Sequence, residues 1–349
     1  MKNKIIIFGS NGFVGSSIAG EMSKNNEVVC IIRNKNSCSF LSNKGLNTKI
    51  CNTLDYNQVE EVIDNQSIVI NCINGDYQTL IESTSNIALA SIKKNASKLI
   101  HLSSTDVYGN SKGIILEQNN FRADRGEYSK AKIESEKILI RLQKKIPIII
   151  LRPGIIFGPE STLWTNRILE RKLNGFNLPN HSKKGICNLT FIYDLVRSIC
   201  IVSDSYDNSS TFNIINDGSM TWSEYYESFH TTPYKSKLVY KNDFFLKIVV
   251  LSQYPIRLIA RPILKNFRFI INIFYQKSKY SNNLLKSAQS GLKRNPDLNE
   301  LNLLSTKVSY SNKQSKKILN MNYTSLNDAF KQTQKWIKQS NLVKALHQL

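Results

Sequence analysis

Short, continuously apolar runs alternate with longer amphipathic stretches through the first half of the chain. The apolar runs span Lys4–Phe8, Glu27–Ile32, Ser67–Cys72, Lys98–Ser103 and Pro147–Leu151, and the amphipathic stretches span Val14–Lys24, Tyr56–Asp64, Tyr77–Lys94 and Glu127–Lys145. Runs of Ile, Val and Leu without polar alternation are typical of strands buried on both faces. Strands that alternate with helices predict an α/β protein with a doubly wound parallel sheet.

The pattern changes after Pro159. We expect helices over Leu163–Leu173, Phe191–Ser203 and Ser325–Leu346, a strand over Thr211–Ile215, a loop over Gly175–Gly185 and a capped helix over Thr221–His230. A chain of 349 residues is long enough for about two domains.

The net charge of +21 is unevenly distributed. Residues 235–294 contain 13 Lys or Arg and a single acid, Asp243. The basic character therefore belongs mainly to one segment and differs from a patch that would bind nucleic acid, so we expect no nucleic-acid partner. Four cations of this segment are at helical spacing: Arg257, Arg261, Lys265 and Arg268. An ordinary amphipathic helix of a soluble domain is the commoner explanation, and a helix lying on an anionic membrane is the alternative.

Targeting and redox signals in the sequence are weak. No apolar run reaches the ~20 residues that a membrane span needs, and the run Ile5–Phe8 is too short for a signal peptide. The six cysteines form no C-x-x-C pair, which favours reduced, buried thiols. We therefore expect a cytoplasmic protein, peripheral to the inner face of the membrane if the basic segment binds lipid.

A glycine-rich turn, Gly9-Ser-Asn-Gly12-Phe-Val-Gly15, follows the first predicted strand and opens the first predicted helix. Glycines at this spacing allow a tight turn and a close approach to a pyrophosphate, which the helix N-terminus then faces. The turn predicts a dinucleotide site whose contacts come from Gly9, Asn11, Gly12, Phe13, Val14 and Gly15.

Two further motifs carry groups suited to proton transfer. Tyr128 and Lys132 are four residues apart, so they share one face of a helix, although this spacing is common by chance. A nearby ammonium favours the phenolate and would lower the pKa of Tyr128. Ser104 follows a buried strand, where it would donate a hydrogen bond to a substrate oxygen or simply cap a turn.

Together the motifs resemble those of the extended short-chain dehydrogenase/reductases, the NAD-dependent epimerase/dehydratase group. The resemblance covers nearly the whole chain and rests on the following segments: the glycine turn, Ser104-Thr-Asp-Val-Tyr108-Gly, Tyr128 with Lys132, Arg152-Pro-Gly154-Ile-Ile-Phe-Gly-Pro159, Phe191-Ile-Tyr-Asp-Leu195, Phe212-Asn-Ile with Thr221-Trp222, and the tail from Ser325 to Trp336. It implies that Tyr128 is the general acid/base, that Lys132 lowers its pKa and holds the nicotinamide ribose, and that Ser104 orients the substrate. It also implies that Pro153 and Gly154 line the nicotinamide pocket.

The sequence departs from the family at three places. After the second strand there is no acid to bind the ribose hydroxyls of NAD, and Arg33 with Lys35 would suit the 2′-phosphate of NADP, so of NAD and NADP we slightly favour NADP. Only half of the Asp-Glu pair typical of 4,6-dehydratases is present, at Thr105-Asp106. The arginines that usually hold the substrate pyrophosphate have no clear match, because Cys187 or Asn188 lies near the position of one of them.

The sequence as a whole predicts a Rossmann-type sheet with a smaller C-terminal substrate domain. We assign residues 1–158 and 189–216 to an NAD(P)-binding domain and residues 159–188 and 217–349 to a substrate-binding domain. The expected function is that of an NAD(P)-dependent epimerase or reductase acting on a hydroxyl or keto carbon of a nucleotide sugar. A dehydrogenase of lipid or sterol-like alcohols, similar to the 3β-hydroxysteroid group, and a non-catalytic NAD(P)-binding regulator remain as alternatives, and a homodimer is compatible with the sequence. No metal site is predicted.

Overall fold

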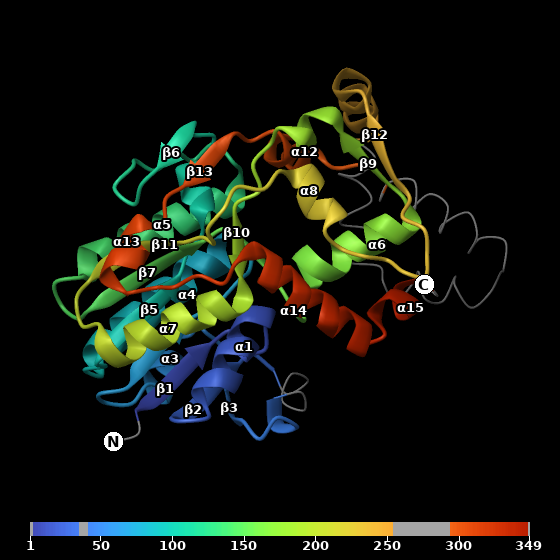
Figure 1. Cartoon of the computed structure of the whole chain (residues 1–349). Helices are drawn as coiled ribbons and strands as arrows, with labels where there is room; N and C mark the ends of the chain where they lie inside the picture. The colour runs from blue at the N-terminus through green and yellow to red at the C-terminus, as the bar shows by residue number, and fades with distance from the viewer. Residues whose placement is uncertain (1–2, 35–40, 254–293, 348–349) are drawn as a thin grey trace, which may run out of the picture. The chain divides into compact units, whose positions relative to one another are not determined.

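The computed structural model describes residues 3–34, 41–253 and 294–347 (Figure 1). Their contacts divide into two compact units. Unit 1 contains Met1–Thr162, Asn188–Gly218 and Val308–Ala329, and unit 2 contains Leu163–Cys187, Ser219–Lys307 and Phe330–Leu349. The sequence-based division assigned residues 308–329 to the substrate domain, whereas they pack with unit 1. The reason is that β13 (Val308–Tyr310) pairs with β6 (Gly113–Ile115) of that unit.

A parallel seven-stranded sheet forms the centre of unit 1 and confirms the predicted fold class. Its strands, in spatial order, are β11 (Ser210–Ile214), β7 (Ile148–Pro153), β5 (Lys98–Leu102), β4 (Ile68–Asn71), β1 (Lys4–Phe8), β2 (Glu27–Ile32) and β3 (Asn47–Ile50). The strand order reverses direction between β1 and β4. Such a switch point is where open α/β sheets bind ligands, outside the carboxyl ends of the strands.

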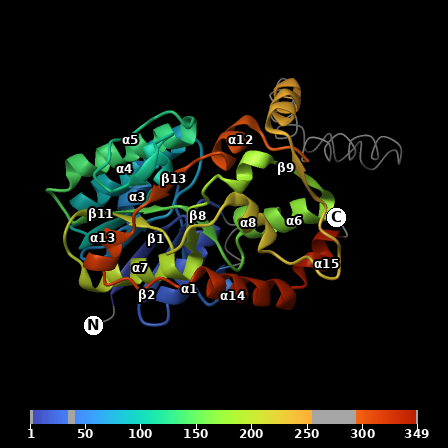
Figure 2. The ribbon, with the colours of Figure 1, turned by 45° about the horizontal axis from the view of Figure 1, so that its top comes forward.

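Helices cover both faces of this sheet (Figures 1 and 2). One face carries α3 (Tyr56–Val62), α4 (Tyr77–Lys93) and α5 (Glu127–Leu142), and the other carries α1 (Phe13–Met22) and α7 (Ile192–Ser205). The central strands are almost free of solvent contact because β-branched residues fill both of their faces: Ile5, Ile6 and Ile7 of β1 are all 0% exposed. This rigid sheet fixes where each loop at its carboxyl edge begins.

Smaller elements complete unit 1. They are a 3-10 turn η2 (Thr105–Tyr108), the parallel pair β8 (Ile155–Phe157) and β10 (Leu189–Phe191), and α13 (Lys313–Ile318). These short elements, like β3, were not predicted from the sequence. β3 reads Asn-Thr-Lys-Ile and is mostly exposed at the edge of the sheet, so it lacks the apolar run that identified the other strands.

Unit 2 is built around a second, small parallel pair, β9 (Phe176–Pro179) with β12 (Leu238–Lys241). Its other elements are the π-helical turn η3 (Thr162–Asn166), α6 (Arg167–Asn174), η4 (Asn180–Lys183), α8 (Trp222–Glu227), a helix over residues 243–253, α12 (Leu298–Leu304) and α15 (Leu342–His347), while α14 (Leu326–Gln339) runs from unit 1 into unit 2. Among the described residues, no helix is long and apolar enough to cross a membrane.

Two predictions in this region were wrong and one lies outside the described residues. The expected loop Gly175–Gly185 contains β9 and η4, and the expected helix Ser325–Leu346 is broken at Asn341, whose φ is +52°. The capped helix after Thr221 is confirmed, with a reciprocal hydrogen-bond pair between Thr221 and Glu224. The predicted basic helix with Arg257, Arg261, Lys265 and Arg268 is outside the described residues.

Candidate active site

The glycine-rich turn connects the end of β1 with the start of α1. Gly9 has a φ of +78°, and a Cβ there would lie 2.8 Å from the backbone of Cys72, at the end of β4. A Cβ on Gly15 would lie 2.3 Å from the carbonyl oxygen of Gly9. Both positions therefore require glycine, one for the turn and one for the close packing of the helix against it.

The middle glycine leaves the N-terminus of α1 accessible. Gly12 is the N-cap, no side chain caps the helix there, and the first turn has no acidic residue. A Cβ on Gly12 would meet only the Gly9 carbonyl, at 3.4 Å. The first N–H groups of α1, beginning with Phe13 and Val14, therefore face outward at the positive end of the helix dipole. The turn fits a dinucleotide pyrophosphate, and the exposed Asn11 lies beside it.

Ser104, Tyr128 and Lys132 come together at the end of β5. Ser104 caps η2, where its Oγ accepts a hydrogen bond from the backbone N–H of Asp106 at 3.1 Å. Lys132 follows one turn later on α5. Its Nζ donates to the carbonyl oxygen of Leu102 at 2.7 Å and lies 5.9 Å from the centre of the Tyr128 ring.

The electrostatics of this trio differ from the expectation. Desolvation raises the pKa of Tyr128 although 39% of the residue is exposed, the Asp106 carboxylate raises it further, and the Ser104 side chain lowers it less. Burial also lowers the pKa of Lys132 to about 8. The expected lowering of the Tyr128 pKa by Lys132 is therefore not observed. Helical spacing brings the two side chains to one face, but Nζ reaches the Leu102 carbonyl instead of the phenol.

A buried ion pair lies one turn beyond Lys132. Glu136 is 0% exposed and accepts hydrogen bonds from Nε of Arg152 at 2.9 Å and from the Ser103 hydroxyl. Nη1 of Arg152 donates to the Tyr108 hydroxyl at 2.7 Å, and that hydroxyl donates to Asn213 at 2.8 Å. The pair thus connects α5 with β7, and the remaining polar atoms around it are satisfied by η2 and β11.

The end of β7 supplies the predicted Pro153 and Gly154. Pro153 is buried, and the backbone N–H of Gly154 donates to the Thr190 hydroxyl at 2.9 Å. A Cβ on Gly154 would lie 2.3 Å from the carbonyl oxygen of Asn188. This close contact within the protein requires glycine at position 154. Because Gly154 also lies at the carboxyl edge of the sheet, it is still a candidate contact of the cofactor.

Arg33 lies at the same edge of the sheet, directly after β2, and is exposed. Its predicted companion Lys35 lies outside the described residues. The structure thus places Arg33 on the strand next to β1, where a side chain can approach the ribose of a dinucleotide bound at the glycine turn.

Sequence reasoning missed two charged residues of the site. Asp106 is held by Arg125, whose Nη1 lies 3.1 Å from its Oδ1, and it acts on the pKa of Tyr128. Glu136 raises the pKa of Lys132. A signal existed for Glu136, because it lies four residues after Lys132 and therefore on the same helix face. No spacing rule could place Asp106 beside Tyr128, since they lie on different elements.

Comparisons with known proteins identify the family to which the chain belongs. The model of the "NAD dependent epimerase/dehydratase family" matches residues 5–218. The chain therefore belongs to this family of enzymes, as its motifs indicated.

A UDP-glucose 4-epimerase from Vibrio cholerae is 22% identical over 244 residues, which cover 60% of this chain and 73% of that protein. The fold is similar to that of UDP-glucuronic acid 4-epimerase from Bacillus cereus in complex with NAD (TM-score 0.67, 18% identity, 96% and 97% of the two chains). It is also similar to that of UDP-glucose 4-epimerase from Thermotoga maritima with UDP-glucose (TM-score 0.69, 15% identity, 97% and 99%).

The first prediction concerns the buried ion pair. Glu136→Leu should lower the free energy of unfolding by about 3–5 kcal/mol, because it leaves the Arg152 guanidinium buried without its partner. Urea unfolding of the full chain measures the change. The matched control is Glu134→Leu on the same helix, whose partner Lys137 is exposed, and it should cost less than about 1 kcal/mol. Equal, small losses in both variants would show that the pair does not anchor α5.

The second prediction concerns the charge beside the phenol. Asp106→Asn removes a negative charge that raises the pKa of Tyr128, so the pH at which activity in the oxidising direction reaches half its maximum should move to lower values. The pH profile of kcat/KM measures this shift. The control is Glu134→Gln, which removes an exposed carboxylate from α5, the helix that carries Tyr128, and it should leave the pH profile unchanged. A profile that does not move in Asp106→Asn would assign the titration to another group.

Proposed function

We propose that this protein is a nicotinamide-dependent epimerase or oxidoreductase that acts on a hydroxyl or keto carbon of a nucleotide-activated sugar. The observation that carries the proposal is the convergence of Ser104, Tyr128 and Lys132 at the carboxyl end of β5, where Nζ of Lys132 lies 5.9 Å from the centre of the Tyr128 ring. The same sheet carries the glycine turn and the uncapped helix α1 at the end of β1. A proton-transferring group and a dinucleotide cradle therefore belong to one rigid element.

The chain's own residues would divide the chemistry as follows. Tyr128 takes the proton of the substrate hydroxyl when the carbon is oxidised and returns it to the keto oxygen afterwards. Ser104 donates a hydrogen bond to the same substrate oxygen, and Lys132 lies beneath the phenol as a buried cation that can also reach a ribose. The nicotinamide, when bound, accepts and returns a hydride. Tyr128 must be a phenolate before it can take the proton of the substrate hydroxyl, so its raised pKa opposes the oxidising step and favours the step that returns the proton.

We propose NAD as the cofactor. The structure of the Bacillus cereus relative contains NAD, and no relative considered above is named with NADP, so the preference for NADP drawn from Arg33 lacks support. The position of Arg33 after β2 nevertheless makes it the residue to test. Gly9, Asn11, Gly12, Phe13, Val14 and Gly15 would hold the pyrophosphate, and Pro153 and Gly154 would lie against the nicotinamide.

The substrate class rests on the relatives, which are named for UDP-glucose and UDP-glucuronic acid. A screen of UDP-, GDP- and dTDP-sugars against lipid alcohols tests it, with nicotinamide absorbance reporting net oxidation and product analysis reporting epimerisation. Turnover of a nucleotide sugar supports the proposal. Turnover restricted to lipid alcohols would replace it with the steroid-dehydrogenase-like alternative.

The third prediction tests the acid/base. Tyr128→Phe should lower kcat by about 10²–10⁴-fold, the usual contribution of general acid–base catalysis, while the affinity for the cofactor stays nearly constant because the ring remains. Steady-state kinetics and cofactor titration measure the two effects. Tyr206→Phe removes a hydroxyl that hydrogen-bonds Ser210 at the opposite edge of the sheet, and it should retain wild-type kcat. Wild-type turnover of Tyr128→Phe would exclude Tyr128 from this role.

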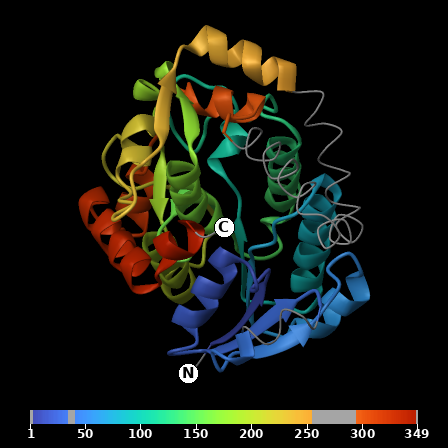
Figure 3. The ribbon, with the colours of Figure 1, turned by 90° about the vertical axis from the view of Figure 1, so that its right-hand side faces the viewer.

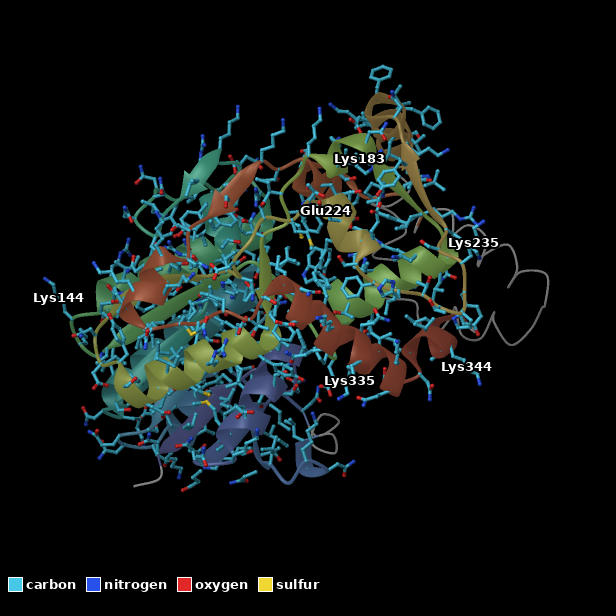
Figure 4. The ribbon with its side chains drawn as sticks, viewed as in Figure 1. Lys144, Lys183, Glu224, Lys235, Lys335 and Lys344 are labelled. Carbon is cyan, nitrogen blue, oxygen red and sulfur yellow. The ribbon has the colours of Figure 1, made fainter. Side chains whose placement is uncertain are left out.

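The fourth prediction tests the cofactor. If NAD is the cofactor and Arg33 is a solvated side chain, Arg33→Ser should leave the Kd of NAD nearly unchanged, and the wild type should bind NADP more weakly than NAD. Fluorescence titration with both dinucleotides measures this. Lys144→Ser (labelled in Figure 4) is the control for a loss of surface charge, because Lys144 lies in the exposed turn before β7, whereas the glycine turn follows the carboxyl end of β1. If the wild type prefers NADP and Arg33→Ser loses that preference, Arg33 binds the 2′-phosphate and the cofactor is NADP.

A further inference from the structure

The helix over residues 243–253 in unit 2 is held in place by one of its sides. Leu246 and Val250, four residues apart, are each 1% exposed and pack with Leu301 and Leu298 of α12. At its start, the Asp243 carboxylate accepts a hydrogen bond from the backbone N–H of His181 at 3.0 Å and lies 3.2 Å from the His181 ring nitrogen. The orange helix that follows β12 in Figure 3 lies along the outside of this unit.

The opposite side of the same helix is apolar and exposed. Its large side chains are Phe244 (75% exposed), Phe245 (57%), Ile248 (50%) and Leu251 (49%). Spacings of one, four and seven residues place them along one stripe that faces away from Leu246 and Val250. We call these four residues the exposed stripe. Single exposed apolar residues are ordinary, but four that are contiguous on one helix indicate a contact surface.

Two lysines lie next to the exposed stripe along the chain. Lys247 is an exposed member of the same helix, and Lys241 ends the preceding strand β12. Nζ of Lys183 lies 4.4 Å from the centre of the Tyr240 ring in β12. The acid at the start of the helix, Asp243, is engaged by His181. The Tyr240 hydroxyl donates to the Glu227 carboxylate, so Lys183 has an acid nearby, and the positive charge beside the stripe comes from Lys241 and Lys247.

We propose that the exposed stripe is a docking surface for an anionic lipid bilayer. An apolar helix face with basic neighbours matches the interface between lipid tails and anionic headgroups, where aromatic and aliphatic side chains insert and ammonium groups remain at the surface. A second copy of the chain fits less well. A stable dimer buries about 800 Å² on each partner, and four side chains supply well under this area.

The composition of the surrounding segment agrees with this partner. In the sequence, residues 235–294 carry 13 Lys or Arg against Asp243 alone. Each cation near such a surface strengthens binding by about fivefold at low ionic strength, and the effect falls off within about a Debye length. The docking surface does not depend on the proposed catalytic function, because it lies in a different unit from the candidate active site.

The experiment is flotation of the full-length protein with vesicles of phosphatidylcholine alone or with 30% phosphatidylserine, roughly the anionic share of a charged leaflet. We expect binding to the anionic vesicles in low salt and its loss in high salt. Phe244→Ser/Ile248→Ser should weaken binding by about tenfold or more, because it removes inserted apolar area. Lys241→Gln/Lys247→Gln should weaken it by about 25-fold and also reduce its salt dependence.

The control variant is Ile114→Ser, which removes an isoleucine that is 74% exposed in unit 1, and it should bind like the wild type. Thermal unfolding and sedimentation accompany each variant. The proposal is overturned if the wild type ignores anionic vesicles in low salt. It is equally overturned if Phe244→Ser/Ile248→Ser lowers the melting temperature strongly, which would mean that the stripe packs against the chain itself, or if that variant converts a dimer to a monomer.

Discussion

The ion pair between Glu136 and Arg152 is the interaction on which the candidate active site depends. Two charges at this depth cost several kcal/mol to desolvate, and they are tolerated because each remaining polar atom has a partner on a neighbouring element. The pair fixes the rotation of α5 against β7. That rotation decides which face of α5 meets the carboxyl edge of the sheet, and hence where Tyr128 and Lys132 lie.

The same region shows how far burial changes the chemistry of the trio. Lys132 is 3% exposed, and desolvation lowers its pKa to about 8 even though Glu136 lies one turn away. With this pKa the Lys132 ammonium loses its proton above about pH 8, and it can then no longer stabilise a phenolate. The pKa of Tyr128 is instead raised by partial desolvation and by the carboxylate of Asp106, which Arg125 holds in place. Proton transfer would therefore respond to groups of η2 as well as to the helix that carries the tyrosine.

Cations in unit 2 serve different purposes according to their depth. The Arg171 guanidinium stacks on Phe176 at 3.9 Å and pairs with Glu300, and Lys172 donates to the carbonyl oxygens of Tyr226 and Phe229 at the end of α8. These side chains are committed to packing, so neither is available to hold a substrate phosphate. Exposed lysines such as Lys247 are not part of the packing, so their charge is accessible to solvent and to binding partners.

The sequence by itself determined the parallel sheet and the place of the candidate site. Strands β1 and β2 have the bounds that their Ile and Val runs predicted, and Gly9 and Gly15 occupy positions that other residues could not. Tertiary structure alone decided the pairing of β9 with β12, the direction of the Lys132 side chain and the approach of Asp106 to Tyr128. The physical reason is the separation along the chain over which each interaction acts. Local sequence controls backbone conformation and burial over one element, whereas partners distant in the chain meet only after several elements have packed.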